Sequence, residues 1–137
     1  MTDATKSKSG GCLCGAVRFD VTGPLRDIIL CHCTMCQKTG GHHFAATAAL
    51  TADLDIKPSG SLKWFKSSNH AKRGFCADCG SSLFWEMVGR DSTSIMAGSF
   101  DEDIDLPVTA QVFMADRKSY YTPDATIPAY DTYPKGS

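Results

Sequence analysis

The stretch Cys31-His32-Cys33-Thr34-Met35-Cys36 decides how this chain is organised. Three thiols within six residues are too close together to be unrelated core cysteines, and at this spacing they can all face one point. A cation of borderline softness such as Zn²⁺ is the natural partner of such a thiolate trio. The stretch therefore predicts a metal site.

The other four cysteines form two pairs, Cys12-Leu13-Cys14 and Cys76-Ala77-Asp78-Cys79. On an extended backbone, residues i and i+2 point to the same side, so Cys12 and Cys14 can offer both sulfurs to one ion. A CxxC turn also brings its sulfurs together, and Gly80 after it supplies a positive φ. Because a structural zinc site takes four ligands, usually as two pairs, these four cysteines predict one structural zinc.

Cys31, Cys33 and Cys36 are then left as three ligands for a second zinc, the number typical of catalytic sites. We favour an open site, with water or substrate in the fourth position. The alternative is a closed site completed by a histidine. His32 lies between two ligands and points away from them on an extended backbone, whereas His42 and His43 follow a Gly-Gly break and could fold back. An iron–sulfur cluster fits the trio less well.

Composition limits the function classes. The chain has 137 residues, 42% of them hydrophobic and 21% charged, and a net charge of −1, so bulk attraction to nucleic acid or to a membrane is not expected. No long apolar stretch and no secretory signal are evident. We therefore expect a cytoplasmic protein. In that reducing compartment seven cysteines bind metal rather than form disulfides, and an odd number agrees with this.

The hydrophobic pattern predicts a mainly β chain, with a flexible tail over residues 1–10 and a single zinc-binding β domain over residues 11–137. In the segment 16–22, Val17, Phe19 and Val21 alternate with polar residues, as in a half-buried strand. Further strands are predicted over residues 28–30, 43–50, 54–57, 62–65, 72–75, 82–88, 94–100 and 108–114, and one helical turn over 34–38. Segment 43–50 is ambiguous between helix and strand. Segments 54–57 and 62–65 flank a Pro-Ser-Gly turn and predict a hairpin.

The motifs also carry a family resemblance. Residues 10–19, residues 31–36 and residues 73–80 together resemble the glutathione-dependent formaldehyde-activating enzyme family, which includes centromere protein V. The resemblance extends from about Gly10 to Tyr133. It implies a β-tent fold of packed antiparallel sheets, stapled by zinc. It also implies a structural zinc and a catalytic zinc at the two cysteine sets described above.

The chain departs from the family pattern in two places. Many members carry a His-Ile pair and a Trp near the last strand, where this chain has Gln111-Val112 and Tyr120-Tyr121. The His42-His43 pair stands where small or apolar residues are common. We expect both differences to bear on the pocket and therefore on the substrate.

The resemblance implies carbon–sulfur lyase chemistry, similar to that of S-(hydroxymethyl)glutathione synthase. Glutathione or another thiol adds to a small aldehyde such as formaldehyde, with the three cysteines acting as zinc ligands and not as nucleophiles. Lys38, Lys72 and Arg73 adjoin the motifs and could bind an anionic thiol, while His42 and His43 could bind substrate or transfer a proton. The aromatic residues that could wall a pocket, or simply pack in the core, are Phe44, Trp64, Phe65 and Trp85.

A zinc-stapled domain of this kind could instead bind a protein or peptide without turnover, because fold alone does not decide function. A free coordination position on the second metal distinguishes the enzyme from the binding module. A thiol-redox role for the Cys76 to Cys79 motif is disfavoured, because no thioredoxin-like βαβ pattern surrounds it.

Overall fold

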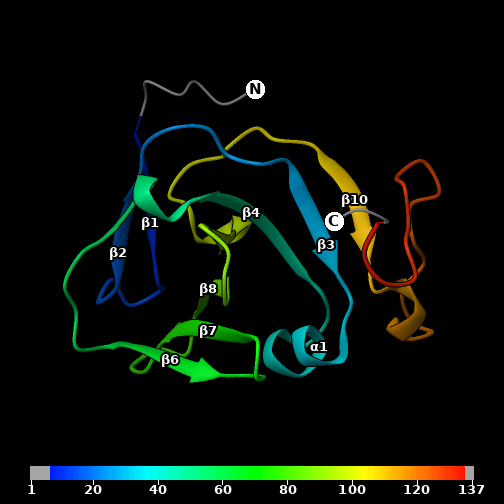
Figure 1. The fold of residues 1–137 in the computed structure, drawn as a ribbon, viewed down its shortest axis with the longest axis horizontal. Coiled ribbons are helices and arrows are strands. Elements are labelled where there is room, and N and C mark those ends of the chain that lie inside the picture. Colours follow the sequence, from blue (N-terminus) through cyan, green and yellow to red (C-terminus); the bar gives the residue numbers. More distant parts are fainter. Residues whose placement is uncertain (1–6, 135–137) are drawn as a thin grey trace.

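The computed structural model describes residues 7–134, which form two β-sheets and little helix (Figure 1). The smaller sheet is antiparallel, in the order β1-β2-β5, and consists of β1 (Lys8–Gly11), β2 (Arg18–Val21) and β5 (Leu54–Ile56). Strand β2 follows the predicted alternation, because Phe19 and Val21 are buried while Arg18 and Asp20 are partly exposed.

The larger sheet has seven strands in the order β10-β3-β4-β9-β8-β7-β6. They are β3 (Ile28–Cys31), β4 (Phe44–Leu50), β6 (Leu62–Lys66), β7 (Ala71–Cys76), β8 (Ser82–Met87), β9 (Ser92–Met96) and β10 (Val108–Val112). Neighbours run antiparallel, except that β10 runs parallel to β3. The predicted mainly β fold of packed sheets is confirmed, with one parallel pair within an otherwise antiparallel arrangement.

The two sheets share an apolar core. Phe19 of β2 packs edge-on against Phe84 of β8 and against Phe100, with ring centroids 5.4 and 5.3 Å apart. Leu83 and Ile95 are fully buried in the same cluster. Each such side chain contributes roughly 1.5–3 kcal/mol when it leaves water, so this cluster is a main source of the stability that holds the sheets together.

Helix α1 (Thr34–Gly40) connects β3 to β4 and extends the predicted turn by two residues. Segment 44–50, whose pattern allowed either state, is strand β4. Three short 3₁₀ turns complete the regular structure: η1 (Thr51–Asp53), η2 (Ala97–Ser99) and η3 (Met114–Asp116). Turn η2 shortens the strand predicted over 94–100, and η3 follows shortly after β10.

Two predictions require correction. Lys8–Gly11 form β1, so the predicted flexible tail over residues 1–10 is wrong for residues 8–10, while residues 1–6 lie outside the described part of the chain. The predicted hairpin of segments 54–57 and 62–65 is also wrong. Strand β5 pairs with β2 in the small sheet, and β6 pairs with β7 in the large one. The turn between them therefore connects the two sheets, because Ile56 and Leu54 pair with the buried Phe19 and Val21 of β2.

Beyond η3 the chain is irregular, as predicted, and returns along β10 on one side of the molecule (Figure 1). Gln111 of β10 holds it there through backbone hydrogen bonds with Pro128 and Tyr130. This return brings Tyr133 back to the large sheet, where it contributes to the site described below.

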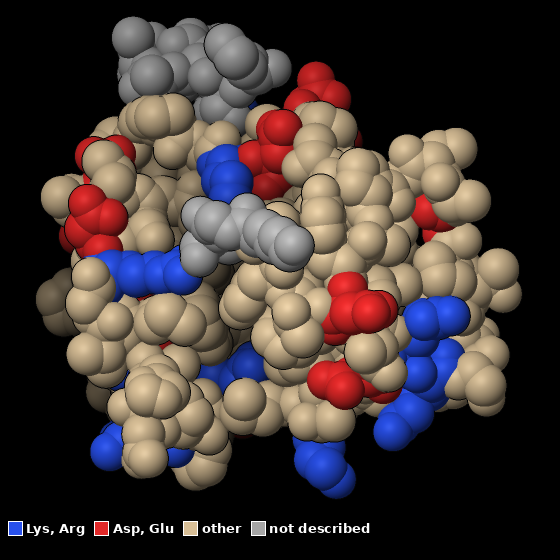
Figure 2. All heavy atoms as spheres, turned by 45° about the vertical axis from the view of Figure 1, so that its right-hand side comes forward, with Lys and Arg blue, Asp and Glu red and all other residues tan. Residues whose placement is uncertain are grey.

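Acidic and basic residues are interspersed over the face shown in Figure 2, with no extended area of one sign. This distribution agrees with the net charge of −1. None of the helices within residues 7–134 has the length and apolar character needed to cross a bilayer.

Candidate active site

The first cysteine cluster joins the two sheets. Cys12 and Cys14 lie between β1 and β2, whereas Cys76 is the last residue of β7 and Cys79 lies in the turn between β7 and β8. Their sulfur atoms lie within 4.8 Å of one another, and the Cys12–Cys14 and Cys14–Cys76 pairs are 3.6 and 3.7 Å apart. A tetrahedron with Zn–S bonds of about 2.3 Å has sulfur–sulfur edges of about 3.8 Å. The cluster therefore has the dimensions of a Cys₄ zinc site.

The local backbone shapes this cluster. Gly15 and Gly80 follow the two pairs and have φ angles of 84° and 80°, in the left-handed region that side chains disfavour. The N–H of Gly80 donates to the carbonyl of Cys76 at 2.8 Å, which closes the turn. Ser81 then places its hydroxyl 3.2 Å from the Cys79 sulfur, and this hydrogen bond lowers the pKa of Cys79 to about 5. One thiolate is therefore favoured before any metal binds.

The second cluster lies where β3 meets α1. Cys31 is the last residue of β3, Cys33 is the N-cap of α1, and Cys36 is buried in the first turn of the helix. Their sulfurs also lie within 4.8 Å of one another, and the N–H of Cys36 donates to the Cys33 sulfur at 3.3 Å. Three sulfurs at these separations fit three corners of a zinc tetrahedron. None of the four histidines is grouped with them in the described chain.

Arg73 places a positive charge against this trio, with Nη2 3.6 Å from the Cys36 sulfur and its guanidinium group above the Phe44 ring. Hydrogen bonds from the Cys31 and Cys36 thiols, assisted by Arg73, lower the pKa of Cys33 to about 2. The negative charge thus concentrates on Cys33. The hydrogen bond that the Cys31 thiol makes with Cys33 raises the pKa of Cys31. Three thiolates around Zn²⁺ carry one net negative charge, which Arg73 would balance.

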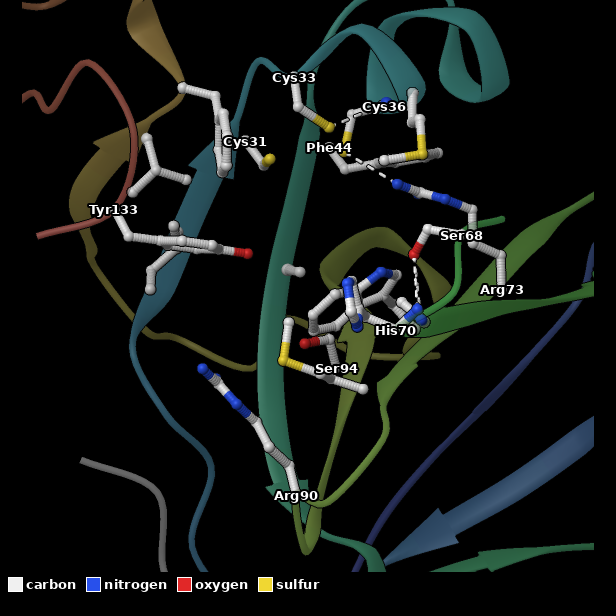
Figure 3. A pocket seen from close by; sticks show the side chains of 18 of the residues that line it. Cys31, Cys33, Cys36, Phe44, Ser68, His70, Arg73, Arg90, Ser94 and Tyr133 are labelled. Atoms are coloured by element: carbon white, nitrogen blue, oxygen red, sulfur yellow. Dashed lines mark hydrogen bonds between the residues drawn. The ribbon is translucent and has the colours of Figure 1, made fainter. Parts of the chain in front are cut away.

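The trio lies at one end of a cavity of about 290 Å³ on the large sheet (Figure 3). Strand alternation creates it: on β9, Thr93 and Ile95 are fully buried, whereas Ser92, Ser94 and Met96 face the cavity. The apolar part of the lining comes from Ile29, Met35, Phe44, Ala46, Ala71, Trp85, Met87, Met96, Val112 and Phe113.

The polar part of the lining is basic. Arg26, Arg73, Arg90 and His70 all line the cavity, and no Asp or Glu is among its lining residues within 7–134. Arg90 approaches from the end opposite the cysteines, and the Tyr133 hydroxyl points between the two ends (Figure 3). Burial and the nearby cysteines raise the pKa of Tyr133, so its hydroxyl keeps its proton. The cavity thus suits an anionic ligand with an apolar part.

The structure separates the predicted site residues. Arg73 joins the cysteine trio, whereas Lys38 lies in another surface depression, with Lys118 and Tyr120. His42 and His43 do not line the cavity and group instead with His32, whose side chain points away from the cysteines as predicted. The remaining candidate cation, Lys72, pairs with Glu86 at 3.5 Å and covers Trp64.

The aromatic candidates also divide. Phe44 and Trp85 line the cavity, whereas Trp64 stacks on Phe84 of the core and Phe65 is 60% exposed. Sequence reasoning missed Arg26, Arg90, His70 and Tyr133. None of the four lies in a cysteine motif or in a strand, so neither motif spacing nor strand alternation could have identified them.

Most of the residues that differ from the family pattern lie outside the cavity. Val112 lines the cavity, but Gln111 is fully buried and donates to the carbonyls of Asp124 and Ile127. The Tyr121 hydroxyl donates to the Gln111 side-chain oxygen at 3.1 Å. Gln111, Tyr121 and the His42-His43 pair therefore lie outside the cavity, and the expectation that they shape the pocket is wrong for them.

The chain is similar to several known proteins. A family model described as the glutathione-dependent formaldehyde-activating enzyme matches residues 7–116. A Schizosaccharomyces pombe protein described as an uncharacterized lyase is 26% identical over 113 residues, which span 82% of each chain. The crystal structure of a Rhodobacter sphaeroides protein, 20% identical, superimposes with a TM-score of 0.58 over 89% of this chain and 98% of that one. At that identity the structural likeness shows a shared fold.

Proposed function

This chain belongs to the glutathione-dependent formaldehyde-activating enzyme family, and from this premise we propose that it is a carbon–sulfur lyase. In the proposed reaction, glutathione or a related anionic thiol adds to a small aldehyde such as formaldehyde, or the adduct is cleaved. The lyase description of the yeast relative supports the reaction class. The observation that carries the proposal is the cysteine trio at the end of a basic, partly apolar cavity.

Two zinc ions would occupy the two cysteine clusters, Cys12, Cys14, Cys76 and Cys79 holding the structural one. Zinc held by Cys31, Cys33 and Cys36 would keep a fourth position, where an incoming thiol loses its proton at neutral pH. The three cysteines act as ligands, and Arg73 offsets the negative charge that they bring together.

The remaining residues bind and orient the substrate. Addition forms one sulfur–carbon bond and moves the thiol proton to the aldehyde oxygen, and cleavage reverses both changes. The protonated Tyr133 hydroxyl faces the cavity and can donate a hydrogen bond to that oxygen (Figure 3). Arg90 lies at the far end and can bind a carboxylate of the thiol substrate. We also infer a cytoplasmic location, because both clusters need reduced thiols.

A cobalt-substituted protein tests the open position. Adding glutathione should shift the thiolate-to-cobalt absorption of the Cys31, Cys33 and Cys36 site, because an outside sulfur enters the metal's coordination sphere. Isotope-labelled formaldehyde followed by NMR should then show faster formation of the glutathione adduct than occurs without protein.

An unchanged spectrum together with no rate increase would contradict the lyase proposal and leave the non-catalytic binding module as the better account. S-methylglutathione is the matched control ligand, because it keeps both carboxylates but has no thiol to release a proton. It should leave the cobalt spectrum unchanged.

The cavity charge gives a second prediction. Replacing Arg90 by glutamine should raise the KM for glutathione about tenfold or more, because hydrogen bonds to charged groups contribute roughly 1.5–3 kcal/mol. The KM for 2-mercaptoethanol, which has no carboxylate, should not change. Lys38→Gln is the matched control, because Lys38 lies outside the cavity. An equal rise in KM for both thiols would show that Arg90 does not bind the carboxylate.

A further inference from the structure

A third group of metal-type ligands lies outside the cavity. His32, His42 and His43 each bring a ring nitrogen within 4.8 Å of the others. Their ring centroids are separated by 4.7 Å for His32 and His43, 5.8 Å for His32 and His42, and 4.2 Å for His42 and His43. These are three of the four histidines in the chain, so their convergence is a specific feature of this fold.

The spacing fits one bound ion. Zinc–nitrogen bonds of about 2.0–2.1 Å in a tetrahedron place imidazole ring centres about 5 Å apart. The three observed centroid separations, from 4.2 to 5.8 Å, lie on both sides of that value. Small rotations of the rings would therefore bring all three nitrogens to the same point.

The cluster also has an unmet need for a partner. His32 is only 1% exposed, and its Nε2 has no hydrogen-bond partner within the described chain. The buried Nδ1 of His43 likewise has none among residues 7–134. Burying a polar nitrogen without a partner is unfavourable by roughly 1–3 kcal/mol, and such atoms are rare in folded proteins. A bound metal ion would satisfy both nitrogens at once.

The fold fixes these imidazoles from several sides. Cys31 and Cys33 face the cavity, so His32 between them projects the other way. The Gln37 side chain donates to the His32 carbonyl at 2.7 Å, and the Tyr121 ring lies 4.7 Å from the His32 ring. Tyr121 is in turn hydrogen-bonded to the buried Gln111. The residues that differ from the family pattern thus surround the cluster.

We propose that His32, His42 and His43 form a third metal site, which binds a first-row transition metal ion such as Zn²⁺. The ligand atoms of the cluster are all imidazole nitrogens, with no carboxylate among them. The nearby depression beside Tyr120 is lined by Lys38 and Lys118 and likewise supplies no carboxylate within residues 7–134. Imidazole nitrogens suit zinc, copper or nickel, whereas Ca²⁺ and Mg²⁺ require oxygen ligands. This site is separate from the cavity and does not depend on the proposed function.

Metal analysis after saturation with Zn²⁺ and removal of free ion tests the site. The wild-type protein should hold one equivalent of zinc more than the double variant His42→Gln/His43→Gln. Both positions are only half-buried, so the double variant should fold. His70→Gln is the matched control, because it removes the fourth histidine and should keep the extra equivalent. Cys33→Ser should also keep it, which separates this site from the proposed lyase site.

Cobalt provides a second readout. The ion bound by histidines should add visible d–d absorption without adding thiolate-to-cobalt charge transfer, and the double variant should lack only this component. Two results would overturn the proposal: equal metal content in wild type and double variant, or an extra equivalent that His70→Gln removes. Either result would identify the three imidazoles as a cluster that only packs against Tyr121.

Discussion

Replacing Cys76 by serine is expected to abolish stable folding of the protein. Cys76 is fully buried at the end of β7, and its sulfur lies 3.7 Å from that of Cys14 in the turn after β1. The free energy of structural zinc binding, about 10–16 kcal/mol in small domains, is comparable to the total stability of a typical domain, about 5–15 kcal/mol. Losing the site should therefore remove most of the stability.

Circular dichroism and thermal unfolding of the variant, with metal analysis, measure this effect. The expected result is an unfolded or aggregated protein, and wild-type protein treated with a strong chelator should behave similarly. Ala77→Ser is the matched control, because it adds the same hydroxyl one residue away at an exposed position and keeps all four sulfurs. A well-folded Cys76→Ser variant with unchanged zinc content would show that these four cysteines do not bind zinc.

Replacing Cys33 by serine should have the opposite profile, a folded protein without activity. Cys33 is the N-cap of α1, and serine is among the preferred N-cap residues, so the introduced hydroxyl can still accept from the Cys36 N–H. The change removes one of three ligands from the second cluster. We expect loss of one zinc equivalent and a fall of at least about 100-fold in kcat/KM, since zinc typically supplies several kcal/mol of transition-state stabilisation.

Unfolding curves, metal content and adduct formation should be measured on the same preparation. Thr34→Ser is the matched control in the same turn, because Thr34 contributes no metal ligand. Collapse of the fold in Cys33→Ser would mean that the second cluster is structural. Full activity with only one zinc would exclude the trio from the reaction.

The cysteine clusters were predictable because metal ligands come in short local spacings. The short spacing within each motif already indicates that its sulfurs can converge, as in the CxC and CxxC pairs and the trio at Cys31, Cys33 and Cys36. Strand β2 was equally readable from its alternation. By contrast, the turn between β5 and β6 is local, but the pairing partners of these strands are distant, so the predicted hairpin placed both strands in one sheet.

The rest of the cavity could not be predicted for a related reason. Arg26, Arg90 and Tyr133 reach it only because the large sheet brings distant segments together. Lys38 is next to the trio in sequence but lies outside the cavity, because α1 carries it into another surface depression. Arg73, which the sequence also named as a candidate, lies on β7 and lines the cavity, with its Nη2 3.6 Å from the Cys36 sulfur.

The first cysteine cluster, which joins the Cys12 and Cys76 turns, has a consequence for synthesis of the protein. Its halves are separated by more than 60 residues, so a ribosome must synthesise over half of the chain before the second pair emerges. At a synthesis rate of roughly 5–20 residues per second, Cys12 and Cys14 emerge several seconds before the other two cysteines of the cluster. If these four cysteines bind the proposed zinc, the zinc supply and the reduction of the thiols during this interval would limit the yield of correctly folded protein.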